Sequence, residues 1–118
     1  MSDGNRSLAE LASEYWKLLR AFERSISLAP ESAKARLNAQ ARYSEERLKV
    51  ILNGLRMKIV SFDGAPFEVN LPVTAINAED VNSESTCVVE RTIEPAVLLG
   101  NEVVITGKVF VVEYKATE

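Results

Sequence analysis

Residues 86–93 (TCVVERTI) and 103–112 (VVITGKVFVV) decide the fold class of this chain of 118 residues. Both runs are rich in valine, isoleucine and threonine, which favour a pleated, half-buried strand. Residues 99–102 (LGNE) supply a turn between them, because glycine adopts a positive φ at little cost. The two runs are therefore predicted to pair, the second extending over Glu102–Tyr114, and Gly107 predicts a bulge or a close backbone approach.

Shorter β-type runs lie upstream. Residues 57–62 (MKIVSF) form one such run, which is followed directly by Asp63-Gly64, a strong turn signal. Residues 73–76 predict another short strand. Residues 77–85 (NAEDVNSES) are polar and poor in strand formers, so they predict a loop. Together these runs predict a small antiparallel β unit of roughly four to six strands.

The N-terminal half has helical patterns instead. Ser7-Leu8-Ala9-Glu10 matches a capping box, in which serine and glutamate bond the free backbone donors of a helix start, so a helix is predicted from Ser7. Pro30 ends this helix and can open the next one. Apolar residues at steps of three and four place one stripe on a single helical face. The stripe consists of Leu8, Leu11, Tyr15, Leu18, Phe22 and Ile26.

A second helix is predicted over Pro30–Asn53, with Asn53-Gly54 as its stop signal. Its apolar seam follows the alternating spacing of a coiled coil. The seam consists of Leu37, Ala41, Ser44, Leu48, Ile51 and Leu55.

Helices followed by strands predict an α+β fold. Residues 1–55 are expected to form a helical hairpin for dimerisation, and residues 56–118 a β wing for partner binding. Two helices leave a broad apolar stripe, and large exposed apolar patches are rare in monomers. Either the β half covers the stripe, or a second copy does so in a dimeric four-helix bundle. The residues expected in this core are Trp16, Leu19, Phe22, Ile26, Leu37, Leu48 and Ile51.

Composition excludes several classes of partner and site. The formal net charge is −3, and the basic residues are spread among acidic ones, which argues against nucleic acid. Residues 1–10 contain no apolar stretch, so we expect no signal peptide or membrane anchor, and a cytoplasmic location. One cysteine and no histidine exclude an internal disulfide and the common zinc geometries, so neither a cofactor nor a metal is expected.

The side chains that could act in catalysis give little indication of an active site. Glu79 and Asp80 are adjacent in a polar loop, and adjacent side chains do not converge on one substrate. Ser83 and Ser85 have no histidine to activate them. Cys87 has β-branched neighbours, which is typical of a small buried thiol rather than a nucleophile. An enzyme is therefore not expected.

A helical hairpin followed at once by a small β unit resembles the layout of GrpE, the family of nucleotide exchange factors of DnaK-type chaperones. Residues 15–26 (YWKLLRAFERSI) resemble its first bundle helix, and residues 50–60 (VILNGLRMKIV) its passage from the bundle into the first strand. Residues 63–70 (DGAPFEVN) resemble the GxxFDPxxHxA segment, with Phe67 and Glu68 at the Phe-Asp positions. Residues 98–112 resemble the closing GYxLxGRVLRPAxVxV run. The chain is similar to a divergent member without the family's long N-terminal helical stalk.

The resemblance implies a homodimer whose β wing binds the ATPase domain of a DnaK-type partner and promotes ADP release. By analogy, the partner-binding residues would be Leu98, Leu99, Gly100, Val104 and Lys108. The alternative is a non-catalytic structural or adaptor dimer that binds an unrelated protein.

Overall fold

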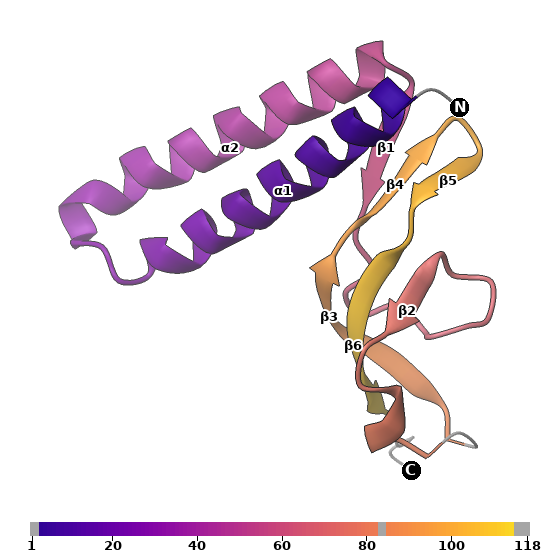
Figure 1. Cartoon of the computed structure of the whole chain (residues 1–118). Helices are drawn as coiled ribbons and strands as arrows, with labels where there is room; N and C mark the ends of the chain where they lie inside the picture. The colour runs from indigo at the N-terminus through magenta and orange to yellow at the C-terminus, as the bar shows by residue number, and fades with distance from the viewer. Residues whose placement is uncertain (1–2, 83–84, 115–118) are drawn as a thin grey trace.

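The computed structural model describes residues 3–82 and 85–114, and its fold is α+β, as predicted (Figure 1). Two helices, α1 (Asp3–Ile26) and α2 (Glu31–Gly54), form a hairpin that projects as an arm from one end of a β unit, residues 57–113. Within the described residues the β unit contains six strands and one short 3-10 helix. These are β1 (Met57–Val60), β2 (Val73–Ala75), η1 (Ala78–Asp80), β3 (Cys87–Glu94), β4 (Ala96–Leu99), β5 (Glu102–Ile105) and β6 (Gly107–Glu113).

Helix α1 begins at Asp3, so the predicted start at Ser7 is wrong. Two contacts hold the additional turn. The Arg6 guanidinium donates to the Val104 carbonyl of β5 at 3.3 Å, and it also pairs with Glu10 at 3.3 Å. Because tertiary contacts hold this turn on the β unit, the local capping signal does not set the boundary.

Helix α2 agrees with its predicted range. Pro30 precedes it in an extended conformation (φ −59°, ψ 144°), and its carbonyl accepts a hydrogen bond from Ala33 at 2.9 Å. At the other end the helix stops at Gly54, as predicted. The residue with a positive φ that leads into β1 is Arg56 (φ 59°), not the glycine.

The strands form two small three-stranded sheets, ordered β1-β4-β5 and β2-β6-β3. The first sheet is antiparallel throughout. In the second, β3 pairs antiparallel with β6, but β2 pairs with β6 in parallel. The expectation of a wholly antiparallel β unit is therefore wrong. Alternation along a strand shows which side chains are buried, but it does not show the direction of the neighbouring strand.

The predicted pairing of the two C-terminal runs is confirmed for Gly107–Glu113, which forms the β3–β6 ladder. The earlier part of the second run, Glu102–Ile105, pairs with β4 instead. The chain passes between the two sheets at two points, from β3 to β4 at buried Pro95 and from β5 to β6 at Thr106. Gly107 lies at this crossing. A Cβ atom on Gly107 would lie 2.9 Å from the Glu94 carbonyl oxygen and 3.0 Å from the Ala96 nitrogen, so the predicted close backbone approach is confirmed.

Among the residues that the structure describes, the core consists of three clusters. One lies inside the hairpin and is built on Leu19, Ile26 and Ala41. Another fills the second sheet around Val89, Val109 and Val111, with Cys87 among them. The third joins the arm to the first sheet, and its buried members are Ala9, Ala12, Leu48, Leu52, Met57, Val97 and Val104. Neither described helix has the length and apolarity that crossing a membrane requires.

Candidate interaction surfaces

Helix α1 presents an apolar stripe to solvent. Leu8, Leu11, Tyr15 and Leu18 are 42, 66, 37 and 73 % exposed. Their spacing of three and four residues places them on one side of the helix, one above the other. Large apolar side chains that are exposed singly are common, whereas large contiguous apolar patches are typical of interaction sites.

A shallow groove lies beside this row, where α1 and α2 meet. It has a volume of about 360 Å³ and is lined by Tyr15, Leu18, Leu19, Phe22, Gln40 and Ser44. The Tyr15 hydroxyl donates to the Ser44 carbonyl at 2.7 Å, which joins the two helices at this level. One heptad after Ser44, Ile51 is 51 % exposed. The exposed row, the groove and Ile51 are together named the hairpin face.

The residues predicted for the dimer core fall into two groups. Leu19, Ile26 and Leu48 are buried within one chain, and Trp16, Phe22 and Leu37 are half-buried against the core clusters. Only Ile51 of the predicted set is largely exposed. The row from Leu8 to Leu18 was predicted as one helical face, but periodicity alone does not separate a surface row from a core row.

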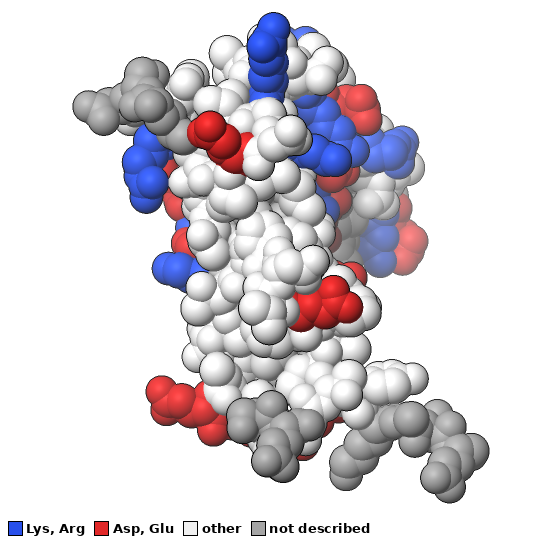
Figure 2. All heavy atoms as spheres, turned by 90° about the vertical axis from the view of Figure 1, so that its right-hand side faces the viewer, with Lys and Arg blue, Asp and Glu red and all other residues white. Residues whose placement is uncertain are grey.

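Four of the five residues predicted by analogy to bind a partner lie in the β4–β5 hairpin. Leu98 and Leu99 are half-buried, Gly100 is exposed in the turn (φ 61°), and Val104 is buried beneath α1. Neighbouring Val103 is largely exposed, although it was not among the predicted contact residues. Figure 2 shows a broad region over the β unit with few charged side chains, while Lys and Arg lie mostly towards its upper end.

Lys108, the fifth, lies in β6 and takes part in a charged cluster between the arm and the β unit. Glu94 accepts from Lys17 of α1 at 3.0 Å and lies 3.5 Å from Lys108. The hydrogen bond from Lys17 is the main reason why the pKa of Glu94 lies below its usual range. Two hydrogen bonds raise the pKa of Lys17; the one to Glu14 has the larger effect, and the one to Glu94 has the next largest. The Lys17–Glu94 pair joins the arm to β3, whereas the more exposed Lys108 lies at the rim of the cluster.

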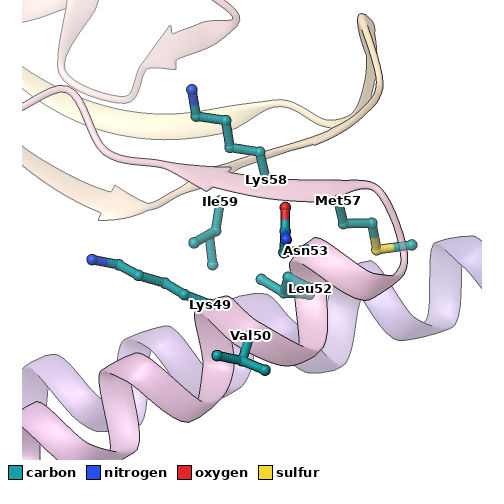
Figure 3. Close-up of a pocket in the computed structure, with 7 residues that line it drawn as sticks. All are labelled: Lys49, Val50, Leu52, Asn53, Met57, Lys58 and Ile59. Atoms are coloured by element: carbon teal, nitrogen blue, oxygen red, sulfur yellow. The ribbon is translucent and has the colours of Figure 1, made fainter.

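A second groove, of about 450 Å³, lies between the end of α2 and β1 (Figure 3). Ile59 points into it towards α2, whereas Lys58 extends from the opposite side of the strand. Its inner wall contains Leu52 and Met57, both members of the cluster that joins the arm to the first sheet. The groove is therefore the outer margin of that junction.

The described residues 3–82 and 85–114 contain no cluster of three or more histidine, cysteine, aspartate or glutamate side chains that could hold a metal ion. Glu79 and Asp80 lie in η1 and are exposed. Cys87 is buried, and its thiol lies 3.7 Å from the Ser85 carbonyl oxygen, so it contributes to packing. Ser83 lies outside the described residues.

No protein-family model, curated protein or solved structure matches the chain.

Proposed function

We propose that the chain is a non-catalytic homodimer of the GrpE type, which pairs through its hairpin face and promotes ADP release from a DnaK-type ATPase. Pairing through the hairpin face is supported by the exposed row of Leu8, Leu11, Tyr15 and Leu18. Two copies that place their hairpin faces together about a two-fold axis would form a four-helix bundle and remove both rows from water.

The shape of the chain supports a division between pairing and partner binding. The arm extends away from the β unit (Figure 1), so pairing along the arm would leave each β unit open to a partner. The weakly charged region over the β unit (Figure 2) suits contact with another protein, because interface cores contain few charged residues. Pairing and partner contact would then use different residues.

The proposed activity needs no reacting group in this chain. A protein that binds the nucleotide-free, open form of an ATPase more tightly than the closed form shifts the equilibrium towards the open form and speeds ADP release. The expected contact is the β4–β5 hairpin and β6, because residues 98–112 resemble the family's closing run. The chain has no histidine and has Val69 where the family has proline, so a divergent DnaK-type partner suits it best.

The test is the rate at which labelled ADP leaves candidate DnaK-type ATPases with and without the chain. Saturable acceleration by the wild-type protein supports the proposal. A stable dimer that accelerates none of them would overturn the exchange function and favour a structural or adaptor dimer that binds an unrelated protein.

A further inference from the structure

A polar cleft lies in the angle between the arm and the β unit, away from the surfaces described above. Its volume is about 480 Å³, and its walls come from α1, the segment after β1, and β3. In Figure 1, α1 is the helix on the inner side of this angle. The residues that line the cleft are Trp16, Arg20, Glu23, Arg24, Ser61, Asp63, Arg91 and Thr92.

Arg20 forms a fixed part of the wall. Its guanidinium carbon lies 5.2 Å from the centre of the Trp16 ring, and its Nη2 donates to Glu45 at 2.9 Å. Its Nε lies 3.1 Å from Glu23, close enough for an ion pair although not aligned as a hydrogen bond. The Arg20 guanidinium therefore stacks on an aromatic ring and pairs with two carboxylates of the same chain, so its charge is already compensated.

Arg24 and Arg91 differ from Arg20. Both side chains are exposed, and neither forms an ion pair or side-chain hydrogen bond with the described residues. The acids of the cleft are already engaged, since Glu23 pairs with Arg20 and the Asp63 carboxylate accepts from the Thr92 backbone amide at 2.7 Å. The cleft therefore offers two guanidinium groups, from two different elements, in a chain whose net charge is −3.

The cleft would stay open in the proposed dimer. Arg20 follows Leu11 by about two and a half helical turns, so the two side chains lie on opposite sides of α1. The hairpin face and the cleft are thus separate surfaces of one helix. A ligand in the cleft does not depend on whether the hairpin face is covered.

We propose that this cleft binds an acidic segment of another protein, with carboxylates on Arg24 and Arg91 and apolar parts beside Trp16. A guanidinium matches a carboxylate through two parallel hydrogen bonds. The cleft volume suits several side chains rather than one small ion. Glu23 and Asp63 oppose a doubly charged phosphate more strongly than they oppose separate single charges. Two arginines on different elements fit carboxylates spaced along an extended segment.

The single tryptophan of the chain is a built-in reporter, because Trp16 lines the cleft. An acetylated and amidated hexaglutamate peptide is titrated into the full chain at low ionic strength while the tryptophan emission is followed. Heat of binding is measured in parallel. We expect a saturable change that weakens as salt is added, since partly exposed charge pairs are screened.

Arg24→Gln and Arg91→Gln should each weaken binding about fivefold at low salt, and the double variant about twentyfold. Arg36→Gln is the matched control, because Arg36 is an exposed arginine of α2 that does not line the cleft. It should bind like wild type. Circular dichroism establishes that each variant is folded, as expected for exposed side chains without partners.

Three results would overturn the proposal. Absence of saturable binding in both emission and heat is the first. Equal weakening by Arg36→Gln is the second, since it would mean non-specific attraction to positive charge. The third is inorganic phosphate binding as tightly as the peptide, which would assign the arginines to a phosphate group instead.

Discussion

Leu11→Gln combined with Leu18→Gln should separate a dimer into folded monomers. Complete burial of an exposed leucine contributes about 1.5–3 kcal/mol. These two side chains are 66 and 73 % exposed in one chain, so covering them would contribute about 1–2 kcal/mol each. A dimer contains two copies of each leucine, and about 4–8 kcal/mol of its association free energy would depend on them.

A loss of that size raises the dissociation constant by about a thousandfold or more. Glutamine is a good helix former, and neither side chain belongs to a core cluster, so the monomer should keep its helicity. Sedimentation velocity over a range of protein concentrations measures the dissociation constant, and circular dichroism measures helicity. Val69→Gln is the matched control, because Val69 is a fully exposed apolar residue of the β unit.

A wild-type chain that sediments as a folded monomer at all concentrations would refute pairing through the hairpin face. A double variant that dimerises as tightly as wild type would also refute it, because the pairing would then use another surface.

Three further predictions concern the β unit and its junction with the arm. Gly107→Ala should lower the free energy of unfolding by about 1–3 kcal/mol in urea denaturation, because its Cβ would press on the backbone at Glu94 and Ala96. Gly54→Ala is the control and should be neutral or stabilising, because nothing lies within 4 Å of its Cβ position. An equal loss of unfolding free energy in both variants would contradict the close approach at Gly107. Cys87→Ala should lower the free energy of unfolding in urea by about 1–2 kcal/mol and leave sedimentation unchanged. An altered association state in a variant that still unfolds cooperatively would show that the thiol has a further role. Glu94→Gln should remove a small, acid-sensitive part of the stability, less than about 1 kcal/mol. Because the pKa of Glu94 is lowered in the folded chain, its contribution is present above about pH 4.3 and is lost as the pH falls through the lowered value. The partner Lys17 has a raised pKa, so its contribution is lost only as the pH rises above about 10.4. An unchanged acid limb in thermal melts of Glu94→Gln between pH 3 and 7 would contradict this account.

Much of the fold followed from the sequence because its strongest signals are local. Apolar spacing predicted both helices, Pro30 the boundary between them, and Gly107 a close approach that the β3–β4 crossing requires. The start of α1 was missed because contacts from Arg6 to β5 outweigh the capping signal at Ser7. The parallel β2–β6 pair was missed because no local pattern encodes strand direction.

The surfaces were harder to predict than the fold. Leu18 and Leu19 are adjacent apolar residues, yet one is exposed and the other buried, because the position of α2 decides which side of α1 is covered. The arginine cleft brings together Arg24 and Arg91, which lie far apart in the sequence. Neither residue belongs to a motif, so only their placement across the arm and β3 could identify the cleft.

The rate of labelled ADP release from a DnaK-type ATPase tests the proposed function most directly. The wild-type chain, present in excess over the ATPase, should raise this rate in a saturable way. Leu98→Asp with Lys108→Glu should abolish the increase while sedimentation and helicity stay as in wild type, because an apolar contact is lost and a rim charge is reversed outside the hairpin face. A double variant that accelerates release as fast as wild type would show that these residues are not the contact. A wild-type dimer that leaves the rate unchanged for every DnaK-type ATPase tested would contradict the exchange function itself.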